Sequence, residues 1–373
     1  MGLKNFTIVG LDVGGANIKV AKVEAVGDKV LNVKVIRKHF PIWIKGKESL
    51  PWVLEWIKAR LGLADKFYVA LTMTAELSDV YRVKSEGVKH IIKTVSEVFR
   101  KAKEIFVLNV KGELIESSEA LNMDPHLFAA SNWVASGVYV GESISKNCFF
   151  VDIGSTSTTI VPIVNGKVFV KGFRDPEKLV FGELVYLGFL RTNIPAIVNK
   201  VPYKGFFAKV SSEKFALMGD VVRILGLISE KEYTTETADG RGKGIRECWE
   251  RLSRVPCADA EILSFEEAVE IARYVYEKAV EQIFDAIMQL RTRLISEGVS
   301  LNNFEAITAG IGSKLAFEAL RRAGFSRIRD LSRILGKKVS SVFPAYALAL
   351  ITLRCLVREE TSGHQNWWVL HLQ

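Results

Sequence analysis

Two short stretches of sequence decide the fold, and the first reads GLDVGGAN at residues 10–17. A β-branched run from Thr7 to Val13 precedes four turn-forming residues, and the strand pattern resumes from Ile18 to Val23. This order predicts a β-hairpin at the start of the chain. It excludes a Rossmann dinucleotide motif, because the glycines are spaced GxxxGG and the turn leads into a second strand rather than a helix.

The second stretch repeats the first about 140 residues later, as VDIGS at residues 151–155. A buried-strand run at 148–153 is followed by a small polar turn at 154–158 and another strand at 159–164. Both stretches read apolar, Asp, apolar, Gly, small. The repetition predicts two similar halves that face each other.

Strands and helices alternate over the rest of the chain, which favours an α/β architecture. Asp124 and Pro125 supply an N-cap and a first-turn proline, and Ser264 and Glu267 have the spacing of a capping box. We expect strands at 67–73, 105–108 and 305–308, and helices near 49–61, 87–103, 124–136, 211–225, 264–295, 313–322 and 344–360. The tail from Thr361 to Gln373, with Trp367 and Trp368, gives no clear pattern.

Composition narrows the classes of function. The 373 residues carry a formal net charge of +9, but the basic residues are mixed with acidic ones and form no tail or stripe, so nucleic acid is not expected as a partner. No apolar run is long enough to span a membrane, and a cytoplasmic location is expected. The four cysteines are dispersed and form no zinc motif, so we expect buried free thiols.

The two hairpins suit a phosphate ligand. Glycine turns let backbone N–H groups approach a phosphate closely, and an Asp at each strand end, Asp12 and Asp152, can hold Mg²⁺ when phosphate oxygens supply the other ligands. A glycine-rich helix start at 309–313 offers a third phosphate or ribose contact. The candidate residues for binding the phosphate and its metal are Gly14, Gly15, Asn17, Gly154, Ser155, Thr156, Gly310, Gly312 and Ser313. Among them, Asn17 is expected to orient the turn or a metal-bound water.

Two phosphate hairpins followed by a glycine-rich helix start resemble the actin, sugar-kinase and Hsp70 ATPase superfamily. Further motifs make the chain similar to the hydantoinase/oxoprolinase-related branch found in archaea and methylotrophs, over roughly residues 5–355. These motifs are GLDVGGANIK at 10–19, TMTAELSD at 72–79, SNW at 131–133, VDIGST at 151–156, RT at 191–192 and TADGR at 237–241.

The resemblance implies a two-lobed actin-like (ribonuclease H-like) α/β fold with the site in the cleft between the lobes. Residues 1–147 plus 344–373 would form the first lobe and residues 148–343 the second. The implied activity is a transferase of methanofuran biosynthesis, which uses Mg²⁺ to join an aminomethylfuran carrying a CH₂-diphosphate to the phenol oxygen of γ-glutamyltyramine, with release of pyrophosphate. Its partners are therefore a phosphorylated small molecule and a phenolic amine; a homo-oligomer is left open.

Residues for the chemistry are chosen on the same basis. A phenol has a pKa of about 10, so a general base is expected, and Glu76 and Asp79 follow a strand whose end faces the cleft in such a fold. Glu76 could instead cap a turn, and Asp79 could be an ordinary surface carboxylate. Lys19 could reach a phosphate or remain solvated.

Two arginines are candidates for binding the carboxylate of the substrate. Arg191 and Arg241 both have the planar guanidinium that suits bidentate contact with a carboxylate. Either arginine could instead belong to a structural ion pair.

Three positions depart from the family pattern. Thr159 stands where many relatives have an acidic residue, Ala75 stands where glycine is expected, and Asn193 replaces a proline. Loss of an acid at 159 would disfavour hydrolysis. An ATP-dependent small-molecule kinase or lactam hydrolase, and a non-catalytic nucleotide-binding regulator, remain as alternatives.

Overall fold

The computed structural model describes residues 4–63 and 66–362. These residues form two compact units. Unit 1 comprises the described parts of Met1–Cys148, Val161–Lys178 and Leu331–Gln373, and unit 2 comprises Phe149–Ile160 and Leu179–Asp330. In this division residues 161–178 and 331–343 fall in unit 1. Trp367 and Trp368 lie outside the described residues.

Unit 1 contains a six-stranded sheet in the order β3-β2-β1-β4-β5-β6. The expected hairpin is β1 and β2, which pair antiparallel, whereas β1 and β4, and β4 and β5, pair parallel. The strands are β1 (Asn5–Val13), β2 (Asn17–Val26), β3 (Lys29–His39), β4 (Tyr68–Met73), β5 (Glu104–Leu108) and β6 (Leu114–Glu116).

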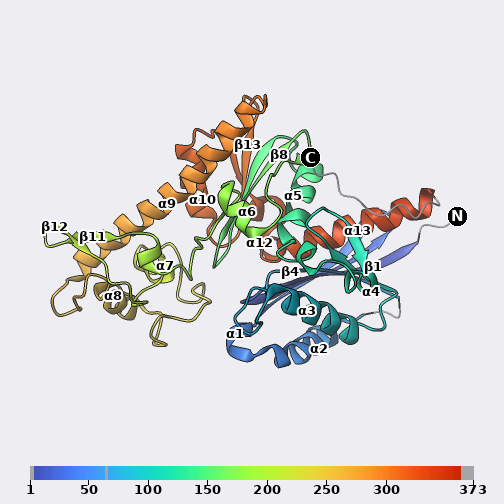
Figure 1. Ribbon diagram of the computed structural model, residues 1–373, viewed down its shortest axis with the longest axis horizontal. Helices are drawn as coiled ribbons and strands as arrows, with labels where there is room; N and C mark the ends of the chain where they lie inside the picture. The colour runs from blue at the N-terminus through green and yellow to red at the C-terminus, as the bar shows by residue number, and fades with distance from the viewer. Residues whose placement is uncertain (1–3, 64–65, 363–373) are drawn as a thin grey trace. The chain divides into compact units, whose positions relative to one another are not determined.

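Helices cover both faces of this sheet (Figure 1). Alternate residues of β1, such as Val9, Leu11 and Val13, join a core with α2 and α3, while the opposite face packs against α13. Gly10 permits that packing, since a Cβ there would lie 2.0 Å from the carbonyl oxygen of Ala345. The helices of the unit are α1 (Ile42–Lys45), η1 (Lys47–Ser49), α2 (Leu50–Leu61), α3 (Lys84–Val98), α4 (Ser117–Ala120), η2 (Pro125–Leu127), α5 (Asn132–Ser143), α11 (Leu331–Leu335), α12 (Lys337–Ser340) and α13 (Phe343–Ser362).

A segment from the middle of the chain completes unit 1. It holds the two-residue strand β9 (Lys167–Val168) and the beginning of α6 (Asp175–Val180). Gly137 and Gly141 let α5 lie against it, because a Cβ on Gly137 would be 2.9 Å from Val168 and one on Gly141 would be 2.4 Å from the oxygen of Gly166. This close packing explains why 161–178 belongs with unit 1.

The second sheet has the order β10-β8-β7-β13-β14, with β9 paired to β8. In unit 2 the long helix α9 runs from the region of α7 and α8 to the region of β13 and α10 (Figure 1). The remaining elements are β7 (Cys148–Ile153), β8 (Thr158–Val164), β10 (Leu184–Val185), η3 (Ile194–Ala196), β11 (Lys200–Tyr203), β12 (Phe206–Lys209), α7 (Met218–Ile224), α8 (Ile245–Ser253), α9 (Phe265–Ser296), β13 (Glu305–Ala309), α10 (Ser313–Arg322) and β14 (Ile328–Asp330).

Several local predictions need correction. The helix expected at 124–136 is interrupted: Asp124 caps only η2, and Ala130, with φ of 50°, separates η2 from α5. The helix expected at 211–225 begins only at Met218, because Leu217 is extended and bridges Asn193. Cys148, Cys248 and Cys355 are buried as expected, whereas Cys257 is exposed.

Among residues 4–63 and 66–362, no helix is both long and apolar enough to cross a membrane.

Candidate active site

The hairpin of unit 1 carries a buried carboxylate at its end. Asp12 pairs with Lys19 in the β1–β2 register, and Lys19 Nζ donates to Asp12 Oδ2 at 3.0 Å. The Asp12 side chain has no exposed surface, and its Oδ1 has no hydrogen-bond partner within the described chain. A buried carboxylate oxygen that lacks a donor is costly unless a ligand, ion or water completes it. Asp12 could therefore bind a ligand through one oxygen, while Lys19 compensates part of its charge.

The turn behind Asp12 is tight. The Gly14 N–H donates to the carbonyl of Asn17 at 3.1 Å, and a Cβ on Gly14 would lie 2.7 Å from that carbonyl oxygen. Gly15 is less constrained, because the nearest atom to a Cβ there is 4.0 Å away on Trp43. The turn thus requires glycine at position 14 and tolerates a side chain at position 15.

Glu76 lies beside this hairpin end. The N–H groups of Thr74 and Ala75 both donate to the carbonyl of Val13, at 3.0 and 3.1 Å, so the segment leaving β4 is held against the end of β1. Glu76 is 1% exposed, and its Oε2 has no hydrogen-bond partner among the described residues. Unit 1 therefore holds two buried carboxyl groups with an unpaired oxygen, on adjacent segments.

Burial raises the pKa of Glu76 to about 7. Backbone groups of Glu76 and Ala130 and the positive charge of Lys84 oppose the shift, while the negative charge of Asp175 adds to it. A carboxyl group with a pKa near the working pH can both accept and release a proton, which is the property of a general base or acid. Asp79 lies in the same segment, but its residue is exposed.

Unit 2 repeats the hairpin turn. The Gly154 N–H donates to the carbonyl of Ser157 at 2.9 Å, as Gly14 does to Asn17. A Cβ on Gly154 would come no closer than 3.6 Å to that oxygen, so this turn is less tight than the first. Asp152 occupies the second-last position of β7, as Asp12 does in β1.

Two further segments pack on the unit 2 turn. Gly310 has φ of +80°, and a Cβ there would lie 2.4 Å from Asp152 Oδ1; the Gly312 N–H donates to Ile153 just before Ser313 opens α10. On the other side, the N–H of Arg191 donates to the carbonyl of Ser155 at 2.9 Å, and Arg191 Nη1 donates to Thr156 Oγ1 at 3.3 Å. The predicted residues of unit 2, apart from Arg241, therefore lie together.

Arg241 belongs to a different network. Its Nε donates to Asp239 at 2.7 Å and its Nη1 to Glu250 at 2.6 Å, which is the ion-pair alternative considered from the sequence. Although burial acts to raise it, hydrogen bonds from Arg241 and the charge of Arg251 hold the pKa of Asp239 at about 2. The guanidinium of Arg241 is thus engaged with two carboxylates.

The sequence did not reveal the centre of that network, the buried pair of Arg251 and Asp220. Arg251 Nη2 donates to Asp220 Oδ1 at 2.8 Å and Arg251 Nη1 donates to Asp239 at 3.0 Å, with no exposed surface on Arg251 or Asp220. Residues 220, 239 and 251 are separated in the sequence, and no local pattern of polar residues links them. The available signal was an arginine on the apolar face of α8, beside Cys248 and Leu252.

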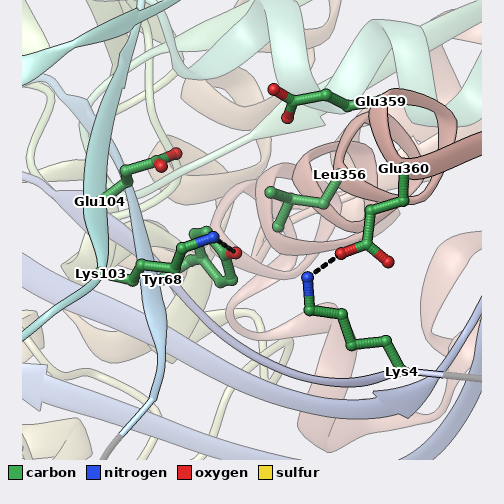
Figure 2. A pocket seen from close by; sticks show the side chains of 7 residues that line it. All are labelled: Lys4, Tyr68, Lys103, Glu104, Leu356, Glu359 and Glu360. Atoms are coloured by element: carbon green, nitrogen blue, oxygen red, sulfur yellow. Dashed lines mark hydrogen bonds and ion pairs between the residues drawn. The ribbon is translucent and has the colours of Figure 1, made fainter. Parts of the chain in front are cut away.

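A surface pocket of about 340 Å³ is also present in unit 1, but it is not the candidate site. Figure 2 shows that Lys103 donates a hydrogen bond to the Tyr68 hydroxyl and that Lys4 forms an ion pair with Glu360 in this pocket. Lys4 precedes β1, Tyr68 begins β4 and Lys103 precedes β5. The pocket therefore lies at the amino ends of these strands, whereas Asp12 and Glu76 lie at the carboxyl ends.

A magnesium ion fits the residues present if a phosphate accompanies it. Within residues 4–63 and 66–362, no three or more His, Cys, Asp or Glu side chains gather as a complete metal site. Mg²⁺ needs only one or two carboxylates when substrate phosphates supply its other ligands. The unpaired Oδ1 of buried Asp12 meets that requirement.

Comparison with known proteins identifies the family. The model of the hydantoinase/oxoprolinase family matches residues 68–355. This chain belongs to the hydantoinase/oxoprolinase family. It is 36% identical over 342 residues to the (4-{4-[2-(γ-L-glutamylamino)ethyl]phenoxymethyl}furan-2-yl)methanamine synthase of Methanocaldococcus jannaschii, covering 92% of this chain and 96% of that protein. A synthase of the same name from Methanococcus vannielii is 33% identical over 216 residues, which are 57% of this chain and 94% of that protein.

A solved structure supports the fold alone. The nucleotide-free structure of acetone carboxylase superposes with a TM-score of 0.55 at 11% identity, covering 93% of this chain and 70% of that one. The actin-like α/β fold expected for this hydantoinase/oxoprolinase family member is confirmed.

Proposed function

We propose that this chain forms the aryl ether bond of the phenoxymethylfuran amine after which its synthase relatives are named. The observation that carries the proposal is the 36% identity to the Methanocaldococcus jannaschii synthase over nearly the full length of both proteins. The substrates would be an aminomethylfuran bearing a CH₂-diphosphate and the phenol of γ-glutamyltyramine. The ether formed from these two substrates belongs to methanofuran biosynthesis.

The reaction exchanges one carbon–oxygen bond for another. The phenol oxygen forms a bond to the furan CH₂, the bond from that carbon to the diphosphate oxygen breaks, and pyrophosphate leaves with the electron pair. The phenol proton passes to a base. The electron-rich furan stabilises positive charge on its CH₂, so stabilising the leaving group contributes much of the acceleration.

Glu76 is the base in this proposal. Its buried carboxyl group has an unpaired oxygen and a pKa of about 7, which supports proton transfer near neutral pH. The phenol, with a pKa of about 10, remains the weaker acid. The phenol becomes more acidic as its oxygen forms a bond to the furan carbon, which is already losing its diphosphate. The difference between the pKa of the phenol and that of Glu76 therefore closes as the reaction proceeds. Asp79 is the weaker candidate because it is exposed.

The hairpin end of unit 1 would hold the diphosphate. When bound, Mg²⁺ would neutralise charge on the departing pyrophosphate. Asp12 would offer Oδ1 to the ion, and Lys19, held 3.0 Å from Oδ2, would keep the carboxylate in place. Backbone N–H groups of its glycine turn would contact phosphate oxygens. The turn of unit 2, with Asp152 before it and the start of α10 against it, is a second candidate for contact with phosphate.

Arg191 is the better candidate for the glutamyl carboxylate of the acceptor. It contacts Thr156, within the cluster around Asp152, whereas Arg241 is bound by Asp239 and Glu250. Arginine binds carboxylates through two parallel hydrogen bonds. An Arg191→Lys variant should therefore raise KM for γ-glutamyltyramine more than KM for the diphosphate.

The test is a reaction with defined substrates. Purified protein, Mg²⁺, the furan diphosphate and γ-glutamyltyramine should yield the ether by mass spectrometry, with one pyrophosphate released per ether formed. ATP in place of the furan diphosphate should give neither phosphate release nor a phosphorylated acceptor. Robust ATP turnover without ether formation would instead support the kinase or lactam hydrolase alternative.

A further inference from the structure

An ion pair lies beside the buried Glu76 carboxyl group. Lys84 Nζ contacts Asp175 Oδ2 at 2.7 Å, and each side chain is 21% exposed. Lys84 is the first residue of α3, and Asp175 is the first residue of α6. The pair therefore ties the beginnings of two helices of unit 1 to each other.

Close packing fixes Glu76 next to one of those helix starts. Gly87 lies in the first turn of α3, and a Cβ there would be 2.7 Å from both Cα and the carbonyl oxygen of Glu76. Only glycine lets α3 approach the Glu76 backbone this closely. In this arrangement the charges of Lys84 and Asp175 both affect the pKa of the Glu76 carboxyl group.

Other polar groups surround the same region. Tyr81, from the connection between β4 and α3, is buried and also interacts electrostatically with Glu76. Behind Tyr81, the Lys47 ammonium and the Glu86 carboxylate pair at 2.6 Å. From α6, the Lys178 ammonium lies 3.7 Å from the ring centroid of Trp133 in α5. Backbone of Ala130, just before α5, hydrogen-bonds to the Glu76 carboxyl group.

Lys84 and Asp175 have opposite effects on Glu76. The positive charge of Lys84 favours the ionised carboxylate, and the negative charge of Asp175 favours the protonated acid. Because the two side chains are paired, their effects largely cancel while both are present. Removing one of them leaves the other uncompensated in a partly buried setting, where charges act strongly.

We propose that Lys84 and Asp175 are positioning residues for proton transfer, which set through their opposed charges the pH at which Glu76 accepts the proton of the substrate. The inference rests on the proposed role of Glu76 as the base. A purely structural tie between α3 and α6 makes a different prediction, because loss of either partner would then weaken the enzyme in the same way without moving its pH dependence.

The test compares Lys84→Met, Asp175→Asn and the double variant with the wild-type chain. Asp175→Asn should move the midpoint of the rise in kcat/KM to lower pH, and Lys84→Met should move it to higher pH, each by roughly half a pH unit or more. The double variant should return close to the wild-type midpoint. Matched controls are Arg354→Met and Glu142→Gln, which break an ion pair of 2.6 Å between α13 and α5 in the same unit. Neither control should shift the profile.

A second readout does not depend on the reaction. Infrared difference spectra between wild type and Glu76→Gln follow protonation of the Glu76 carboxyl group, and the same spectra in each charge variant should show the same opposed shifts. Equal midpoints in all variants, or shifts in one direction for both single variants, would overturn the inference. If Glu76→Gln keeps full activity, the proposed base is wrong even where the infrared midpoints shift, so the two failures are distinguishable.

Discussion

At the scale of single residues, Glu76 combines nearly complete burial with a carboxylate oxygen that has no hydrogen-bond partner in the described part of the chain. Such a group destabilises the folded state unless it is protonated or given a partner. A buried carboxyl group of this kind, next to the hairpin end that carries Asp12, is expected where a protein loses stability in favour of reactivity. Position 76 lies in an ordinary polar stretch, TAELSD, and neither its burial nor its raised pKa is visible from composition.

The pH dependence of the unfolding free energy should report the protonation of Glu76. Its pKa is 4.5 in the unfolded chain and about 7 when folded, so the folded state holds the extra proton between these values. Stability is therefore lost as pH rises from about 4.5 to about 7, by about 3 kcal/mol in total. Glu76→Gln should abolish this loss and be the more stable protein at pH 8, as measured by urea unfolding at pH 5 and pH 8. A variant less stable than wild type at pH 8 would contradict the raised pKa.

Asp12 should matter for activity and little for stability. Asp12→Asn keeps an oxygen that can accept the hydrogen bond of Lys19 but loses the charge offered to a cation. Turnover should fall by about 100-fold or more, since metal-assisted charge stabilisation contributes several kcal/mol to such reactions. The melting temperature should change little. Asp28→Asn, the same substitution at an exposed position in unit 1, is the control and should leave turnover intact. Full activity of Asp12→Asn would remove Asp12 from the site.

At the scale of elements, the parts with strong local signals were predictable. The hairpin β1–β2, strand β13 and the capping box of α9 follow from β-branched runs, turn residues and the Ser264–Glu267 spacing. In these elements the local sequence pattern and the tertiary packing favour the same secondary structure.

Other elements depend on contacts distant in sequence. β3 was missed: it is an edge strand whose residues are largely exposed or half-buried, and Val33 and Val35 alternate with polar residues over only a short stretch. The beginning of α7 was misplaced because the Asp220 carboxylate accepts from the Leu217 N–H and from Arg251, 31 residues away. No local pattern contains that partner.

The start of α10 should be sensitive to a single methyl group. Gly310 and Gly298 both have φ of +80°, but a Cβ at 310 would lie 2.4 Å from Asp152 Oδ1, while no atom of residues 4–63 or 66–362 lies within 4 Å of one at 298. Gly298→Ala should cost about 1–2 kcal/mol, from left-handed strain alone. Gly310→Ala should cost more and also lower turnover, because Asp152 must move. Equal unfolding free energies and equal turnover for the two variants would show that this close approach is unimportant.

At the scale of the whole molecule, the chain uses the same turn twice. Gly14 bonds to Asn17 in unit 1, and Gly154 bonds to Ser157 in unit 2, each just after a strand that ends in Asp and one apolar residue. The repetition was visible in the sequence because both turns need the same small residues. The sequence did not reveal a ligand in the same way, because glycine turns of this kind serve many chemistries on one fold.

Binding of pyrophosphate tests the hairpin turn of unit 1 directly. In calorimetry with pyrophosphate and Mg²⁺, Asp12→Asn should weaken binding, because the carboxylate charge offered to the cation is lost. Asp28→Asn, at an exposed position of the same unit, should leave binding unchanged. Unchanged binding in Asp12→Asn would remove Asp12 from the phosphate site.

The most direct measurement compares rates of ether formation for a series of phenol acceptors in wild type and in Glu76→Gln. With an acceptor whose pKa is about 10, the substitution should slow transfer by about 100- to 10,000-fold, the usual contribution of a general base. With a nitrophenol acceptor, already ionised near neutral pH, the variant should recover most of the wild-type rate. Equal rates for wild type and Glu76→Gln with the high-pKa acceptor would contradict the assignment of Glu76 as the base in aryl ether formation.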